Sequence, residues 1–450
     1  MSVSEPALQP GAGAARARHV PHRWRNLATL TGVTVVDSTE ASMITNLFPS
    51  IAATLRLNNE ALGLLAASGK VISLPFGIGW VWLAARTSRK VALVAAATSG
   101  GVFGIMAGFA ETFLFLLVAN TLMSACVIGA GPIANAVIAD SFDDDNRSRA
   151  VGTFYGVSSL LTAFFGPATA QLSGLTDGWR YGMWVMGTLC ILTGIAVIAL
   201  FREPLVGAAE AQLADLPPDQ HGARPVTWSS VLGLFRIPTF SVMMVSRLLS
   251  GHLLITVFGV QFLVTERGFS NAVAAAVLLP YGIGYFIGAL TGGWVVAVLD
   301  RVLPYHGRVA LLQVGQVLFA VAAYFCTQFV YDGIVVYAGF CVLMGAMQAL
   351  NPVANRPMIM SVVLPELRGQ AFAIFLTIFD TIGWGVFALV AGVLADEIGV
   401  QTVFFWGLVV LMLVNAVWIT LFYLTYPRDA ARVTAVLDAR RHTALLAPSP

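Results

Sequence analysis

Long apolar runs, separated by short polar breaks, cover almost the whole chain. Because about 20 apolar residues in a helix cross the hydrocarbon layer of a bilayer, this pattern predicts twelve transmembrane helices and an all-α membrane protein. The expected ranges are 26–52, 61–84, 91–110, 113–139, 152–172, 181–201, 238–264, 271–299, 309–330, 333–361, 372–395 and 401–426.

The two halves of the chain repeat each other. Gly79-Trp80-Val81 recurs about 214 residues later as Gly293-Trp294-Val295, and Arg147 has a weaker counterpart in Arg368. Duplicated bundles are typical of secondary transporters. A proline-containing segment divides the predicted helices six and six, so we expect two pseudo-symmetric six-helix bundles. The predicted parts are a tail at 1–25, a bundle at 26–201, a linker at 202–237, a bundle at 238–426 and a tail at 427–450.

Composition and charge support this interpretation. The chain is 58% hydrophobic and only 11% charged, against about a quarter charged in soluble domains. Most of its 25 Lys and Arg residues fall in loops on one side, and such loops stay cytoplasmic. We therefore expect both termini in the cytoplasm and a monomeric, multi-pass protein of the plasma membrane. The basic tails fit topology signals or anionic lipid contacts, and no nucleic acid partner is expected.

The sequence gives little support to enzyme chemistry. Its four cysteines all lie in predicted helices without the spacing of metal ligands, so neither disulfides nor a zinc site is expected. We find no nucleophile elbow and no phosphate-binding glycine loop with its lysine. The chain is therefore expected to be neither an enzyme nor an ATP-driven pump, and to need no cofactor.

Two acidic residues near the middle of the first predicted helix carry the sharpest functional signal. A carboxylate at mid-bilayer costs several kcal/mol unless it is hydrated, paired or protonated. Asp37 and Glu40 are three residues apart and share a helical face. We predict that they bind the coupling proton and face a wet passage between the bundles. The alternative is that they only pair with neighbouring helices. Lys70, at a similar depth, could pair with Glu40 or reach the outer interface.

Further polar residues at membrane depth predict a substrate cavity. In the second half, Arg247 could bind substrate or Asp380, or form a structural ion pair, and amides and prolines crowd the tenth predicted helix around Arg356. A lipid-facing helix would not accommodate these groups cheaply. The predicted cavity residues are Lys70, Asn120, Tyr155, Arg247, His252, Gln348, Asn351, Asn355, Asp380 and Trp384.

The loops carry a family pattern. The motif Gly-x-x-x-Asp-Arg-x-Gly-Arg-Arg/Lys is matched at Arg86, Arg89 and Lys90, whereas Ala85 stands at its aspartate and Ser88 at its second glycine. With six plus six helices, the chain over 26–426 resembles the major facilitator superfamily, and within it spinster-like carriers and drug:proton antiporters. The resemblance implies cytoplasmic gating loops that contain Arg86, Arg89, Lys90, Asp300, Arg301 and Arg308.

We therefore expect a secondary transporter that works by alternating access and is driven by protons at Asp37 or Glu40. Few cavity charges of mixed sign among aromatic residues favour export of a small amphipathic organic compound. An alternative is proton-coupled uptake of an organic anion, suggested by Lys70, Arg247 and Arg356. A third possibility, of another class, is a membrane receptor or scaffold that does not transport.

Overall fold

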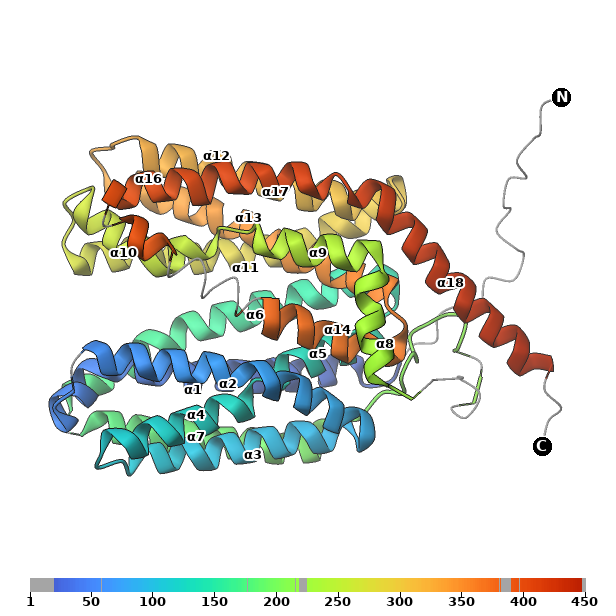
Figure 1. Cartoon of the computed structure of the whole chain (residues 1–450), viewed down its shortest axis with the longest axis horizontal. Helices are drawn as coiled ribbons and strands as arrows, with labels where there is room; N and C mark the ends of the chain where they lie inside the picture. Colours follow the sequence, from blue (N-terminus) through green and yellow to red (C-terminus); the bar gives the residue numbers. More distant parts are fainter. Residues whose placement is uncertain are drawn as a thin grey trace.

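The structure is a computed structural model that describes residues 20–57, 59–175, 177–214, 216–217, 225–379, 381, 390–395 and 397–446. Asp380 and Trp384 lie outside these described residues. The described chain forms helices that run lengthwise side by side (Figure 1), without a β-strand among them. The helices are α1 Arg23–Leu55, α2 Asn59–Arg86, α3 Arg89–Gly108, α4 Phe113–Val127, α5 Ala130–Ser141, α6 Asp144–Ala170, α7 Gly178–Leu200, α8 Trp228–Leu232, α9 Pro238–Leu248, α10 Leu253–Thr265, α11 Asn271–Val302, α12 His306–Gln328, α13 Ile334–Val362, α14 Arg368–Ala373, α16 Val400–Phe404, α17 Leu411–Ile419 and α18 Phe422–Leu446.

Nine helical segments of the described chain are long and apolar enough to cross a membrane. Each of the nine overlaps one predicted span, so the prediction of an all-α membrane protein is confirmed. Two further predicted spans, 26–52 and 152–172, coincide with α1 and α6, which are not among the nine. The span 372–395 is described only in part. The total of twelve therefore stays a prediction.

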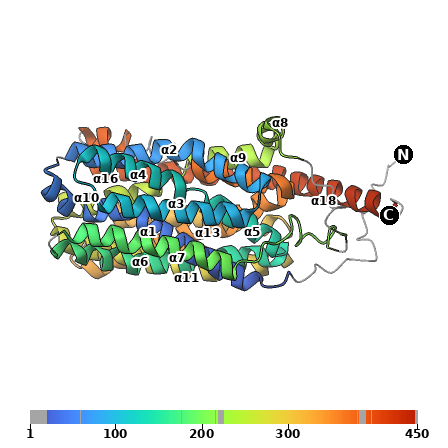
Figure 2. The same cartoon turned by 90° about the horizontal axis from the view of Figure 1, so that it is seen from below.

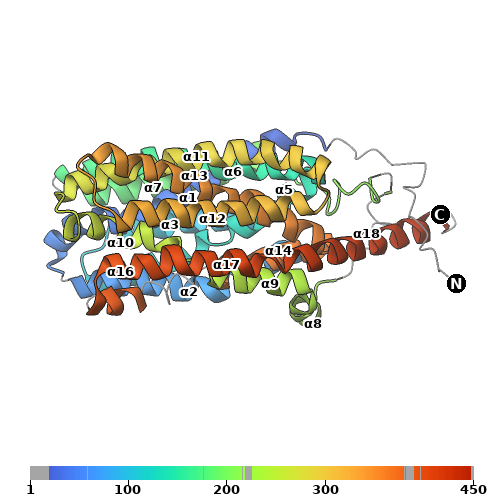
Figure 3. The same cartoon turned by 90° about the horizontal axis from the view of Figure 1, so that it is seen from above.

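The helices form two groups that lie against each other along their length. In Figure 1, α1 to α7 fill the lower half and most of the later helices fill the upper half. We call α1 to α7 the first bundle, and α9 to α14 with α16 to α18 the second bundle; the predicted limits of these domains remain predictions. Both α5 and α14 lie at the end from which α18 projects, and Figures 2 and 3 show the same end from two other sides. We call this the linker end.

Glycines bring helices into close contact within each bundle. A Cβ built on Gly187 of α7 would lie 2.6 Å from the carbonyl oxygen of Gly101 of α3, and a Cβ on Gly284 of α11 would collide with the carbonyl of Val342 of α13. Small residues allow this kind of close backbone approach in membranes. Close packing of the third and eighth predicted helices thus depends on glycine.

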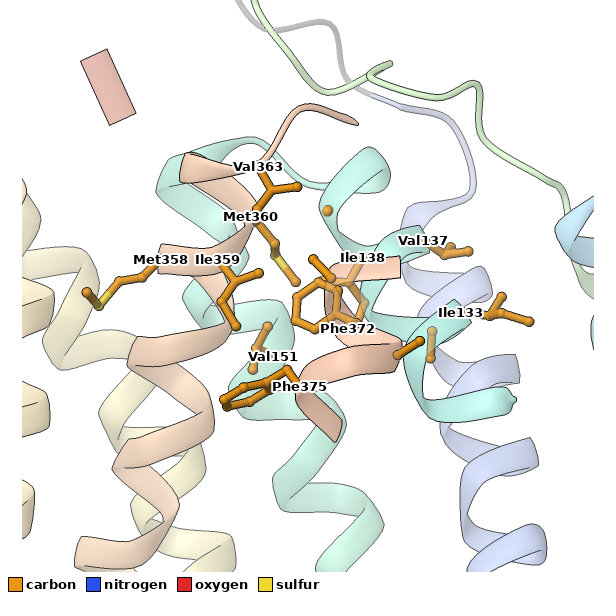
Figure 4. Packing of buried hydrophobic residues seen from close by; sticks show 14 of the residues in the cluster. Ile133, Val137, Ile138, Val151, Met358, Ile359, Met360, Val363, Phe372 and Phe375 are labelled. Atoms are coloured by element: carbon orange, nitrogen blue, oxygen red, sulfur yellow. The ribbon is translucent and has the colours of Figure 1, made fainter. Parts of the chain in front are cut away.

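The apolar cores show where the two bundles join. At the linker end a single core contains side chains of both: Ile133 and Ile138 of α5 pack with Met360 of α13 and with Phe372 of α14 (Figure 4). Towards the opposite end, one core holds only residues between 43 and 186 and another only residues between 254 and 412. The described side chains therefore close the molecule at the linker end, while the opposite ends of the bundles have separate cores.

Candidate functional site

A buried arginine lies where the two bundles meet. Arg356 of α13 is 7% exposed, and its guanidinium lies over the rings of Tyr155 of α6, at 5.2 Å, and Phe375, at 4.7 Å. Its Nη1 donates to Asn355 Oδ1 at 2.6 Å. The Tyr155 hydroxyl in turn accepts from Asn135 Nδ2 at 2.9 Å. The cluster therefore joins side chains of both bundles, and Tyr155 and Asn355, predicted from sequence, both belong to it.

More positive charge faces this cluster from the second bundle. Arg247 Nη1 lies 3.5 Å from Nε2 of His252. The positive charges of Arg247 and Arg356 are close enough to repel each other. His252 is buried, and its Nδ1 has no hydrogen-bond partner among the described residues. Among the described residues, no carboxylate forms an ion pair with Arg356. The Arg356 guanidinium does not lose its proton, so its surroundings are suited to an anion.

The two acidic residues lie elsewhere, inside the first bundle. Asp37 is 6% and Glu40 0% exposed. The thiol Sγ of Cys190 on α7 lies 3.3 Å from Asp37 Oδ1 and 3.0 Å from Glu40 Oε2. A Cβ on Gly104 of α3 would collide with the Glu40 carboxylate, so this glycine makes room for it. The expectation that both acids face a wet passage is wrong for this conformation, because their face of α1 packs on α3 and α7.

The predicted ion pair between Lys70 and Glu40 is also not formed. The second carboxylate oxygen of Glu40 has no hydrogen-bond partner in the described chain, and Lys70 is exposed. Lys70 lies seven residues before Gly77, which packs against Thr377 of the second bundle. Residues seven apart share a helical face. Lys70 therefore faces the second bundle, whereas Glu40 points away from it.

The corresponding helices of the second bundle hold a neutral polar network. Ser246 Oγ donates to Asn415 Oδ1 at 2.8 Å, and Gln316 Nε2 donates to Asn351 Oδ1 at 2.6 Å. Asn415 Nδ2 donates to Gln316 Oε1 at 3.4 Å, and this hydrogen bond joins the two pairs. Asn351, predicted to line the cavity, belongs to this network instead. The described residues of this network thus carry amides and a hydroxyl, whereas the buried group in the first bundle contains two carboxyl groups and a thiol.

Two other predicted cavity residues have different surroundings. Asn120 Nδ2 donates to the carbonyl oxygen of Leu65 at 3.1 Å, which ties α4 to α2 inside the first bundle. Gln348 of α13 is half-buried, and its Oε1 has no hydrogen-bond partner among the described residues. Asn120 therefore lies away from the Arg356 cluster.

Ion pairs join the bundles at the linker end. Glu210 Oε1 accepts from Arg147 Nη2 of the first bundle and from Arg368 Nη2 of the second, at 2.5 Å in each case. Burial alone would raise the pKa of the Glu210 carboxyl, but the charges of Arg147 and Arg368 lower it. The sequence repeat had singled out these two arginines. Their partner Glu210 was missed, because a linker without apolar periodicity does not indicate where its side chains lie.

A second ion-pair group contains a residue that the family pattern predicted. Arg308 Nη2 lies 2.8 Å from Asp144 Oδ2 of the first bundle, and its Nε donates to Asp300 Oδ2 at 2.8 Å. Burial would raise the pKa of Asp144, but Arg308 and Arg147 hold it well below its ordinary value. Arg308 and Asp300 thus contribute to closure of the linker end.

The remaining predicted gate residues differ in their contacts. Arg89 Nη2 lies 2.5 Å from Asp140 Oδ2, and Asp140 also pairs with Arg368 across the bundles. Arg86 instead lies over the ring of Trp82 at 3.5 Å, and Lys90 Nζ donates to the carbonyl oxygen of Ile198. Arg301 is exposed. Only Arg89, of the first-half loop, joins the network between the bundles.

Several known proteins are similar to parts of this chain. A probable 4-methylmuconolactone transporter of Cupriavidus pinatubonensis is 30% identical over 152 residues, 33% of this chain and 36% of its own length. The 4-hydroxybenzoate transporter PcaK of Pseudomonas aeruginosa is 26% identical over 185 residues, 41% of this chain and 40% of its own length. An MFS-type efflux pump of Mycolicibacterium smegmatis is 23% identical over 89% of this chain and 91% of its own length. The chain thus spans little more than a third of the first relative and nearly all of the last.

Solved structures show the same fold. The proton:xylose symporter XylE superposes with a TM-score of 0.70 at 13% identity, over 89% of this chain and 95% of its own. A bacterial homolog of the human lysosomal transporter spinster, in an inward-facing conformation, gives 0.55 at 17% identity, over 95% and 99%. The sequence model of the major facilitator superfamily matches residues 30–304 and 240–448. The chain therefore belongs to the major facilitator superfamily, a family of multi-pass membrane transporters.

Proposed function

We propose that the protein is a proton-coupled secondary transporter whose central cluster binds an organic anion. Arg356 carries this proposal, because it is buried at the bundle interface and no described carboxylate pairs with it. A buried charge without a counter-charge is costly, and an anionic substrate would supply that counter-charge. Such a substrate would touch Tyr155 of one bundle and Asn355 of the other, as a site at the pivot of alternating access requires.

Proton coupling would use the acid pair in the first bundle. Asp37 and Glu40 are buried together, and the single S–H group of Cys190 can donate a hydrogen bond to only one of them at a time. Two ionised carboxylates in this apolar setting would repel each other at high cost. The pair is therefore expected to bind a proton in this conformation and to release it when α1 moves relative to α3 and α7.

The test is transport in proteoliposomes with an imposed pH gradient. 4-Hydroxybenzoate is a suitable first probe, since the relative PcaK is named for it. Arg356→Gln should abolish anion binding, while the exposed Arg301→Gln serves as a matched control and should leave it unchanged. Asp37→Asn and Glu40→Gln should stop gradient-driven transport but leave exchange. Unchanged binding in Arg356→Gln, or competition by cations alone, would contradict the anion site.

Export of an amphipathic compound is the second candidate. It is favoured by the similarity to the efflux pump of Mycolicibacterium smegmatis over nearly its full length. With the linker end on the cytoplasmic side of the plasma membrane, the two functions differ in one measurement. Proton-coupled uptake should be faster when the imposed pH gradient drives protons in the same direction as the substrate. Export by antiport should be faster when the gradient drives protons in the opposite direction to the substrate.

A further inference from the structure

The short helix α8 and the turn after it carry apolar side chains on two sides. Val231 and Leu234 are buried in the core that both bundles share at the linker end. Trp228, Leu232 and Phe235 follow one another by four and three residues, so they share a side, and they are 62%, 66% and 42% exposed. Figure 1 shows α8 running across the direction of the bundle helices, and Figure 3 shows it at the outer edge of the molecule. An exposed apolar side with a tryptophan is typical of a helix that lies in the plane of the membrane surface.

A pocket of about 350 Å³ is lined by α8 and its turn, by the end of α13 and by α18. We call it the α8–α18 pocket. Ile237 on its lining immediately precedes one helical segment that is long enough to cross a membrane, and Val362 is the last residue of another. The pocket therefore lies at the level of the membrane surface. Much of its lining is apolar, through Leu234, Ile237, Val362, Leu364, Leu367 and Val436.

Two arginines on this lining are open to solvent. Arg236 follows α8 and Arg432 belongs to α18, and both residues are exposed. Within the described ranges, neither guanidinium forms an ion pair or a hydrogen bond. Asp429 also lines the pocket, and its Oδ2 accepts from the backbone N–H of Thr239 at 2.8 Å, at the start of α9. Two arginines and one carboxylate give the pocket a net positive charge that a ligand can reach.

We propose that the α8–α18 pocket binds the headgroup of an anionic phospholipid. Arg236 and Arg432 hold the phosphate, because a guanidinium can donate two parallel hydrogen bonds to phosphate oxygens. The exposed side of α8 lies among the acyl chains of the same leaflet and keeps the pocket at headgroup depth. With the linker end on the cytoplasmic side, this is the leaflet that carries anionic lipid. The bound headgroup joins α8 to α18, so it stabilises the second bundle whatever the transported substrate is.

A soluble phosphate compound would use the same two arginines. It would not account for the exposed Trp228, Leu232 and Phe235 beside the pocket, whereas a lipid accounts for both the charge and the apolar surface. The experiment therefore compares a phospholipid with its free headgroup.

The experiment titrates dioleoylphosphatidylglycerol into the purified full-length protein in detergent micelles at constant pH and ionic strength. Dioleoylphosphatidylcholine, which has no net charge, and the soluble glycerol 1-phosphate are the controls. Thermal unfolding and the lipid retained in native mass spectrometry are the two readouts. Phosphatidylglycerol should raise the melting temperature saturably and stay bound, while neither control should do so. An equal effect of phosphatidylcholine or of glycerol 1-phosphate would overturn the proposal.

Variants test whether phosphatidylglycerol acts at the α8–α18 pocket. Arg236→Gln and Arg432→Gln should each weaken its apparent affinity about 5-fold, and the double variant about 30-fold, from the contribution of one arginine at a membrane surface. Arg301→Gln removes an exposed charge outside the pocket in the same bundle, so it is the matched control and should leave the affinity unchanged. Wild-type affinity in the double variant would overturn the proposal. An equal loss in Arg301→Gln would also overturn it, because general surface charge would then explain the binding. If the double variant does not fold, the two single variants still decide.

Discussion

Replacing Glu210 by glutamine removes the charge that joins the bundles at the linker end. One carboxylate oxygen accepts from Arg147 of the first bundle and Arg368 of the second, each at 2.5 Å. Both arginines are buried and Glu210 is nearly so, so water screens these bonds little. We expect Glu210→Gln to shift the protein towards conformations that are open at this end.

The magnitude follows from what remains after the substitution. Hydrogen bonds to charged groups contribute about 1.5–3 kcal/mol each, so losing two sets an upper bound of about 6 kcal/mol. Glutamine keeps one acceptor oxygen. Arg147 also keeps two backbone carbonyl acceptors, and Arg368 keeps one. The expected loss is therefore about 2 kcal/mol, which is roughly a 30-fold change in the ratio of closed to open protein.

Spin labels on cysteines introduced at the exposed Thr87 and Arg301, one in each bundle, report this ratio as a distance distribution. Glu366→Gln is the matched control, because Glu366 pairs with Arg440 at 2.7 Å within the second bundle. It should lower stability without changing the distances. A wild-type distribution in Glu210→Gln, or equal opening in Glu366→Gln, would refute the reasoning.

Three further predictions concern packing and pH. Gly104→Ala puts a Cβ in the space of the Glu40 carboxylate and should lower the free energy of unfolding by about 1–3 kcal/mol. Gly79→Ala, with open space around it, should stay within about 1 kcal/mol of wild type in thermal unfolding. Gly284→Ala meets the carbonyl of Val342 and should be destabilising, whereas Gly282→Ala, whose Cβ lies 3.5 Å from Ala163, should be neutral or stabilising; equal melting temperatures would contradict close helix packing. The pKa of Glu210 is lowered from its ordinary value of 4.5, so its stabilising effect is present above that value and is lost as the pH falls through the lowered pKa. Closure of the linker end should therefore be constant from about pH 8 to 5 and decline below about pH 4, with a smaller decline in Glu210→Gln.

Local sequence predicted those features that depend on neighbouring residues. Apolar runs identified the helices, because a segment in lipid must satisfy its own backbone hydrogen bonds and does so as a helix. The family loop pattern identified Arg89, Asp300 and Arg308, which lie in the ion-pair network of the linker end. Polar residues at membrane depth identified Tyr155, Arg247, His252 and Asn355, which the structure brings together.

Tertiary structure alone decided which way the buried charges point. Apolar and polar residues are spread over all sides of α1, so no single polar face of the helix indicated that Asp37 and Glu40 turn towards α3 and α7. Cys190, which contacts both acids, is 150 residues from Glu40 in sequence, and Glu210 reaches Arg368 across 158 residues. Hydrophobicity and length determine whether a segment crosses a membrane. The direction in which a polar side chain points is determined by the helices that pack around it. Which helices these are depends on contacts between segments far apart in the chain.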